Sequence, residues 1–395
     1  MKSKKRFVLI LLALVCVAAG VVFKLKLDQA SIRVLCPKSA AESFRKVADS
    51  YQGEDFPRIK VQAVDDAKFA EAVKDNLSGK NPVDLVVFTK DALYPSDEVL
   101  SQMRDLSSLP GVESCFLSHQ EGERVSLLPV CGDIPVIYYN ADFFTEQHQP
   151  VPESTYDFLV MCDDFQSLGV CPLGLPKDLN SNGPDLASLV DCSLTNNIYS
   201  PFLDMPVALF NSLEENGIFK QSPASDREKL IVGFRDGAYP MFMGFWTDAS
   251  LVKSIGMPFD FGVFRLPGDI ETNSPLIPTL SVSVPKEAKE EAEAFVSYLL
   301  TDSVQDLLNV EGRGMPIAVA TGHTKLEDPL FRGILAQGVD RSILYSFPVE
   351  KRVRILEWFS GLATGEPMND EALQSILQTS DSLKGDRDET DTEVD

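Results

Sequence analysis

Apolar and polar residues alternate along the first third of the chain in a way that predicts strands and helices in turn. Strands are predicted at 31–35, 59–64 and 83–88, and the last is almost entirely apolar, as in strands buried on both faces. Between them, 39–51 and 69–77 place apolar residues three or four positions apart, which is one face of a helix. This order of elements predicts a parallel α/β sheet with helical crossovers.

The remaining chain continues the mixture of strands and helices. Further strands are predicted at 125–130, 134–139, 241–246 and 281–284. A helix over 287–300 has an apolar face opposite a charged face, as in helices that cover a core. Further helices are predicted near 186–192, 205–216, 303–310, 327–337, 348–363 and 369–379.

The two ends of the chain differ from this pattern. Four cationic side chains within residues 1–6 precede an uncharged apolar segment at 7–23. Its length lies between those of a signal-peptide core and a membrane helix, so residues 1–30 fit either a cleaved signal peptide or an uncleaved signal anchor. In both cases the positive-inside rule places the rest of the chain outside the cytoplasm. Residues 383–395 are charged without an apolar anchor, which predicts a disordered acidic tail.

Charge and cysteine content narrow the function classes. The net charge is −23 at pH 7, and because nucleic-acid binding requires clustered cations, we expect no nucleic-acid partner. In an exported chain, the cysteines beyond residue 30 permit up to three disulfides. We predict a pair between Cys162 and Cys171, with free buried cysteines as the alternative. The six cysteines are Cys36, Cys115, Cys131, Cys162, Cys171 and Cys192.

Motifs of catalytic and metal sites are missing. The chain has no nucleophile elbow, no phosphate-binding loop and no zinc-peptidase motif. Residues 178–183 copy the first half of a calcium loop, but Leu189 stands where a bidentate glutamate is needed, so an Asx-rich turn is the preferred interpretation. We therefore expect a protein that is not an enzyme, with no metal and no cofactor.

Several segments, taken in order, resemble the extracellular solute-binding proteins of ABC importers, the group that includes maltose-binding protein. They are NPVDLVVFTKDA at 81–92, LPVCGDIPVIYYNADFF at 128–144, FRDGAYPMFMGFW at 234–246 and SVSVPKEAKEEAEAFVSYLLTD at 281–302, with GRGMPIAVA and ATGEPMNDEALQSIL further on. None is a strict motif, and the resemblance rests on their order and spacing. The segment 157–225, which holds three of the cysteines, departs from the family pattern.

The resemblance implies an α/β, two-lobed periplasmic-binding-protein-like fold of type II, with mixed sheets flanked by helices and a hinged cleft. Lobe 1 would comprise 31–135 and 276–320, and lobe 2 would comprise 136–275 and 321–382. Ligands would bind between the lobes, at the carboxyl ends of strands.

Residues after two of the predicted strands are candidates for the first-lobe side of this site. Lys38 and Ser39 open a helix whose free backbone N–H groups suit a hydroxyl or an anion, and Ser39 predicts a capping box with the glutamate three residues later. Phe88, Thr89 and Asp91 follow the third strand. The resemblance implies ligand contacts for Phe88 and Asp91, and a carboxylate can accept from two sugar hydroxyls at once.

Three further candidates lie near the predicted crossings between the lobes. Asp133 is expected to bond either the ligand or a hinge amide. Trp246 ends a strand at which the resemblance implies a sugar-stacking platform, with a core tryptophan as the alternative. Tyr345 lies near the last crossing.

The function implied is capture of a small polar ligand, a sugar or oligosaccharide, by a monomer that delivers it to the permease subunits of an ABC importer. Residues 7–23 would anchor the protein at the outer face of the membrane, or cleavage would release it. Two alternatives remain open: a sensory module for a membrane receptor, and a binder of a non-sugar solute such as a peptide or polyamine.

Overall fold

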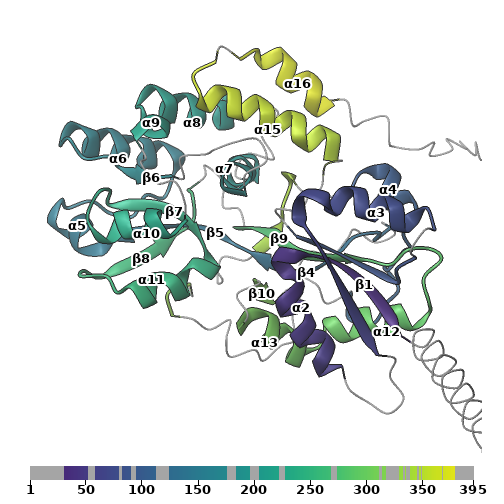
Figure 1. The fold of residues 1–395 in the computed structure, drawn as a ribbon. Helices are drawn as coiled ribbons and strands as arrows, with labels where there is room; N and C mark the ends of the chain where they lie inside the picture. Colours follow the sequence, from purple (N-terminus) through teal and green to yellow (C-terminus); the bar gives the residue numbers. More distant parts are fainter. Residues whose placement is uncertain are drawn as a thin grey trace, which may run out of the picture.

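The computed structural model contains two sheets, each covered by helices on both faces (Figure 1). This agrees with the predicted α/β class and with mixed, helix-flanked sheets. The residues that the structure describes are 31–51, 58–79, 82–89, 95–112, 124–175, 184–195, 204–221, 227–267, 274–310, 314–316, 329–331, 334, 339–344, 347, 349–366 and 368–378.

The first sheet has seven strands in the order β10-β4-β9-β3-β1-β2, with β11 pairing to β9. Strands β1, β2 and β3 are parallel to one another, as the strand–helix alternation predicts, whereas β9 pairs antiparallel with both β3 and β4. The strands are β1 (Ile32–Pro37), β2 (Ile59–Val64), β3 (Leu85–Thr89), β4 (Leu128–Asp133), β9 (Ser274–Ser283), β10 (Met315–Pro316) and β11 (Val339–Arg341).

Alternate residues of the central strands enter two separate cores. Val34 and Val87 pack with helices α2, α12 and α13, while Leu35 and Val86 pack with α3 and the segment around α4. Burial on both faces explains why the third strand is apolar at nearly every position. The helices are α2 (Lys38–Ser50), α3 (Phe69–Leu77), α4 (Asp97–Ser101), α12 (Glu291–Leu299) and α13 (Asp302–Val310).

The second sheet has four strands in the order β6-β7-β5-β8. These strands are β5 (Pro135–Asn140), β6 (Leu173–Gly174), β7 (Met241–Phe245) and β8 (Phe261–Phe264). Tyr138 and Phe242 stack at 4.7 Å on the face covered by α10 (Arg227–Arg235) and α11 (Ala249–Ile255).

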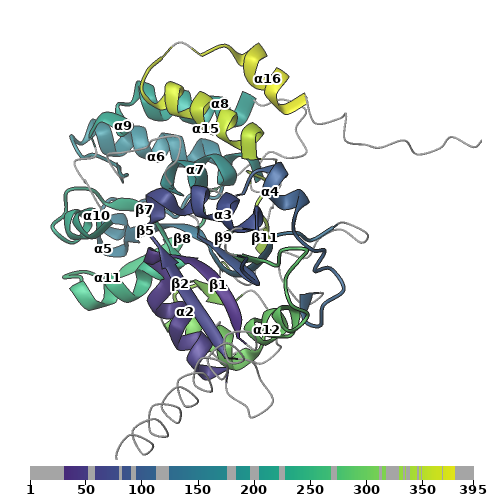
Figure 2. The same cartoon turned by 45° about the vertical axis from the view of Figure 1, so that its right-hand side comes forward.

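Seven helices surround or cover the opposite face of the second sheet, where Ile137 and Met241 enter a separate core. Figures 1 and 2 show α15, late in the chain, lying beside α8 on this lobe, with α16 packed against α15. The helices are α5 (Ala141–Glu146), α6 (Thr155–Ser167), α7 (Pro184–Thr195), α8 (Asp204–Glu215), α9 (Ile218–Gln221), α15 (Val349–Ala363) and α16 (Asp370–Gln378).

Two details differ from the predictions. Helix α2 begins at Lys38 with Pro37 as its N-cap and no side-chain cap, so the Ser39 capping box is wrong, and the helix begins two residues before the position that a Ser39 cap requires. Cys162 and Cys171 are free thiols, so the disulfide predicted between them is absent. Cys162 is instead fully buried on α6, where burial raises the pKa of its thiol.

Some predictions fall on residues that the structure does not describe. These include the leader at 1–30, the tail at 383–395, the calcium-like segment at 178–183 and Cys115. In the described part of the chain, no helix is both long and apolar enough to cross a membrane.

Candidate functional site

The carboxyl ends of three strands meet at the edge of the first sheet that adjoins the second. β1 and β3 run parallel, and β4 runs the same way because β3 and β4 both pair antiparallel with β9. Their last residues, Pro37, Thr89 and Asp133, therefore lie along one edge. Ile134 alone separates β4 from β5, so the chain passes from one sheet to the other at that edge. Crevices beside such strand ends are the usual ligand positions in α/β proteins.

Lys38 and Ser39 are exposed at the start of α2, directly after β1. The Ser39 backbone N–H donates to Asp66 Oδ1 at 3.2 Å, and Asp66 opens the short turn η1 (Asp66–Lys68) after β2. One of the helix N–H groups that we expected to face a ligand therefore donates to a carboxylate of the protein itself. The Lys38 side chain adds a cation to this part of the edge.

Phe88 and Thr89 end β3 and are both buried. The Phe88 ring packs edge-to-face against Phe69 of α3, with ring centroids 5.8 Å apart, so Phe88 belongs to the core between sheet and helix. Thr89 is paired with Leu280 of β9 at the end of the ladder. Asp91 lies outside the described residues, so its predicted contact stays a prediction.

Asp133 is buried at the end of β4, with 1% of its surface exposed. Its Oδ1 accepts from the backbone N–H of Ile134 at 3.0 Å and from that of Thr247 at 3.2 Å, and its Oδ2 accepts from the Thr247 hydroxyl at 2.5 Å. Of the two roles expected for Asp133, a bond to a hinge amide is thus present in the structure.

Trp246 begins the short turn η3 (Trp246–Asp248), which follows β7. Its backbone N–H donates to Ile134 O at 2.9 Å, so the turn is bonded to the residue that connects β4 to β5. The indole is 8% exposed and lies edge-to-face on Phe331, with centroids 5.9 Å apart. This ring is therefore at the predicted edge but largely packed, and its stacking on a ligand stays a prediction. Tyr345 lies outside the described residues.

Two residues that we did not predict, Asp248 and Arg227, hold this turn. The Asp248 carboxylate accepts from the Phe245 backbone N–H at 2.8 Å and lies 3.6 Å from Arg227 Nε. Arg227 also donates to Met243 O at 2.8 Å and lies over the Phe245 ring at 5.1 Å. An aspartate three residues after a strand end is a common signal for such a turn, and it was available in the sequence at Asp248.

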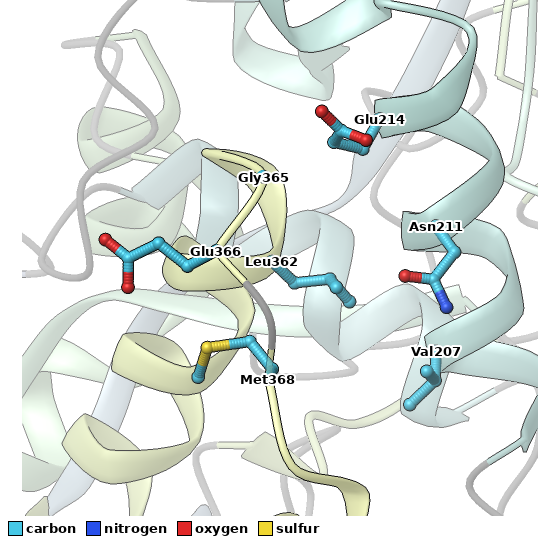
Figure 3. A pocket seen from close by; sticks show the side chains of 7 residues that line it. All are labelled: Val207, Asn211, Glu214, Leu362, Gly365, Glu366 and Met368. Atoms are coloured by element: carbon cyan, nitrogen blue, oxygen red, sulfur yellow. The ribbon is translucent and has the colours of Figure 1, made fainter.

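Histidine, cysteine and acidic residues do not gather into a metal site within the described ranges. A pocket of about 360 Å³ lies apart from the strand ends, between α8 and the turn from α15 to α16 (Figure 3). Figure 3 shows Glu214 and Asn211 on one side and Glu366 and Met368 on the other. None of the predicted site residues lines this pocket, so we do not assign it to the ligand site. The lining residues are Val207, Asn211, Glu214, Leu362, Gly365, Glu366 and Met368.

Solved structures of similar fold match nearly the whole chain. RafE from Streptococcus pneumoniae is 19% identical with a TM-score of 0.64, and the match covers 89% of this chain and 97% of RafE. MalE from Xanthomonas citri, a sugar-binding protein, is 16% identical with a TM-score of 0.67 over 89% of this chain and 96% of MalE. The chain has the two-lobed fold of the solute-binding proteins. The predicted fold class is thereby confirmed, and the strand-end edge is the edge between its lobes.

Sequence comparison adds a match over part of the chain. The multiple sugar-binding protein of Streptococcus mutans is 23% identical over 236 residues. The match spans 54% of this chain and 56% of that relative, so the chain covers just over half the length of the curated protein it matches. No protein-family model matches the chain.

Proposed function

We propose that this chain is an extracytoplasmic solute-binding protein that captures a sugar or an oligosaccharide between its lobes, without chemically changing it, for an ABC importer. The observation that carries the proposal is the convergence of strand ends and the Trp246 turn at the edge between the lobes. The names of the similar proteins support the ligand class, since the S. mutans relative is called a sugar-binding protein and RafE has been solved with raffinose.

Binding would work by hydrogen bonds from one lobe and ring contact from the other. In this proposal Lys38, directly after β1, Thr89, the last residue of β3, and Asp91, two residues later in the sequence, supply polar groups for hydroxyls. The Trp246 turn belongs to the second lobe and supplies an aromatic face. A ligand that contacts both lobes favours the arrangement in which they are close together, because only that arrangement forms every contact.

The same proposal includes location and partners. Residues 7–23 hold the protein at the outer face of the membrane, or are removed with the leader, and the liganded monomer meets the permease subunits there. Anchoring raises its effective concentration near the permease. A mass spectrum of the mature protein distinguishes the two fates of the leader.

A panel of saccharides tests the binding claim by calorimetry on the purified chain after residue 30. The panel includes raffinose, maltooligosaccharides and chitin oligosaccharides, with a short peptide and spermidine as non-sugar controls. We expect one saccharide class to bind with a Kd on the order of micromolar, which corresponds to about 8 kcal/mol. Binding of only the peptide or spermidine would overturn the sugar assignment, and binding of nothing in the panel would count against a transport role.

A further inference from the structure

Asp133 occupies the position at which two parts of the molecule meet. It is the last residue of β4 in the first lobe, where it pairs with Ile277 of β9. Its neighbour Ile134 is the whole connection to β5 in the second lobe. The Asp133 side chain therefore lies directly beside this connection between the lobes.

The carboxylate of Asp133 is bonded across this connection to the second lobe. Thr247 donates to it twice, through its backbone N–H at 3.2 Å and through its hydroxyl at 2.5 Å. The Ile134 N–H adds a third bond at 3.0 Å. Bonds to a buried carboxylate are among the stronger hydrogen bonds in proteins, and removing one donor leaves part of the charge unsatisfied.

Hydrogen bonds hold the backbone on both sides of Trp246. On one side its own N–H bonds Ile134 O and its neighbour Thr247 bonds Asp133. On the other side Asp248 bonds the Phe245 N–H and lies beside Arg227. The backbone that carries the indole is therefore fixed at both ends, which leaves the ring little freedom to change its direction.

We infer that Asp133 and Thr247 form a clasp that positions Trp246 relative to the crossing between the lobes, so that Asp133 acts on the ligand through Trp246. In this assignment Asp133 and Thr247 are positioning residues. The effect on a saccharide rests on the proposed function, whereas the effect on the indole does not.

The two tryptophans of the chain allow a direct test without ligand. In protein labelled with 5-fluorotryptophan, Trp246 and Trp358 give two ¹⁹F resonances, and a Trp246→Phe variant assigns them. We expect Thr247→Val, which keeps the shape but loses the hydroxyl, to shift and broaden the Trp246 resonance and leave that of Trp358 in place. Thr247→Ser restores the hydroxyl and is expected to restore the resonance.

Thr155→Val is the matched control. The hydroxyl of Thr155, which is buried whereas Thr247 is half-buried, also bonds a group distant in sequence, the Pro267 carbonyl at 3.2 Å, but it lies away from the crossing. We expect this variant to leave both resonances unchanged. An unmoved Trp246 resonance in Thr247→Val, or an equal change in Thr155→Val, would overturn the clasp.

A ligand measurement completes the test with whichever saccharide the wild-type chain binds. We expect Thr247→Val to weaken its affinity about fivefold, because the lost bond acts on the ligand only through the position of Trp246, and Thr247→Ser to recover it. If Trp246 moves while the affinity stays unchanged, the claim that the clasp serves ligand binding is refuted. If no saccharide binds the wild-type chain, the proposed function fails while the fluorine result still decides whether the clasp exists.

Discussion

Asp191 on α7 is a carboxylate without solvent exposure. Its Oδ1 accepts from the Leu344 backbone N–H at 2.8 Å, which attaches α7 to the segment between β11 and α15. Burial raises the pKa of this carboxyl to about 6, although the bond from Leu344 and the charge of Arg352 oppose the shift. The folded protein therefore binds a proton at Asp191 more tightly than the unfolded chain does.

This shift predicts how stability depends on pH. The contribution of Asp191 is fully present below its unfolded pKa and is lost as pH rises through about 6. We expect Asp191→Asn, which stays neutral and can accept the Leu344 bond, to gain stability over wild type at pH 8 relative to pH 4, on the order of 3 kcal/mol. Urea unfolding of both proteins at the two pH values measures it, and identical pH profiles would contradict the assignment.

Trp246 is the residue for which a ligand effect is most direct. Replacing it by alanine removes the aromatic face at the edge between the lobes, and we expect saccharide affinity to fall by at least about tenfold, or about 1.4 kcal/mol. Trp358→Phe is the control, because Trp358 is equally buried but donates to Asn369 O between α15 and α16. Calorimetry on both variants separates a platform from a core tryptophan, and an unchanged affinity in Trp246→Ala would remove it from the site.

At the scale of elements, β6 shows how one buried ring sets the spacing of strand and helix. A Cβ atom on Gly174 of β6 would meet Tyr239 Cδ2 and Cζ at 2.6 Å, and one on Gly233 of α10 would meet Tyr239 Cζ at 2.9 Å. The tyrosine hydroxyl donates to Leu230 O of the same helix. Strand, helix and ring thus pack without room for another methyl group.

We expect Gly174→Ala to destabilise the protein by about 1–3 kcal/mol, since the added methyl overpacks the site. In a Tyr239→Leu background, the same substitution should cost clearly less, because the ring it meets is gone. A double-mutant cycle by chemical unfolding measures the difference. Equal costs in both backgrounds would mean that the ring is not what excludes the side chain.

Elements with a clear apolar period were predictable from the sequence. The strand at 59–64 and the helix at 69–77 were predicted with the observed bounds. Strand β9 was underestimated, since only 281–284 has a strand pattern while the strand begins at Ser274 and contains two prolines. The early part of β9 pairs with β4 and β11, which are distant in sequence. A local pattern of apolar residues cannot predict such pairing.

The candidate site was predictable only in part for the same reason. Asp133 was named from its place at the predicted first crossing, and Trp246 from the resemblance. The bond from Thr247 to Asp133 joins residues 114 positions apart and depends on how two sheets meet. The ligand contact of Phe88 was expected from the resemblance and stays a prediction, whereas the packing of its ring against Phe69 depends on side-chain direction along β3.

At the scale of the whole molecule, the two lobes share one apolar core on one side and have separate cores elsewhere. The shared cluster extends from Val34 in the first sheet to Tyr138 and Trp246 in the second lobe. The first crossing is a single residue, so rotation there requires few backbone changes. Any rotation there must also preserve or repack the shared cluster, which limits how far the lobes can separate.

If a saccharide contacts both lobes, its binding should raise the stability of the protein and also make the molecule more compact. At a concentration about 100 times its Kd, binding is expected to add about 2.7 kcal/mol of stability, measured as a rise in melting temperature. The radius of gyration from small-angle scattering should fall in the same samples, because ligand contacts favour the closed arrangement. Trp246→Ala at the same saccharide concentration should show a smaller change in both. A rise in melting temperature with an unchanged radius would mean that the ligand binds to one lobe alone, and the closure mechanism would then have to be abandoned even though binding itself was real.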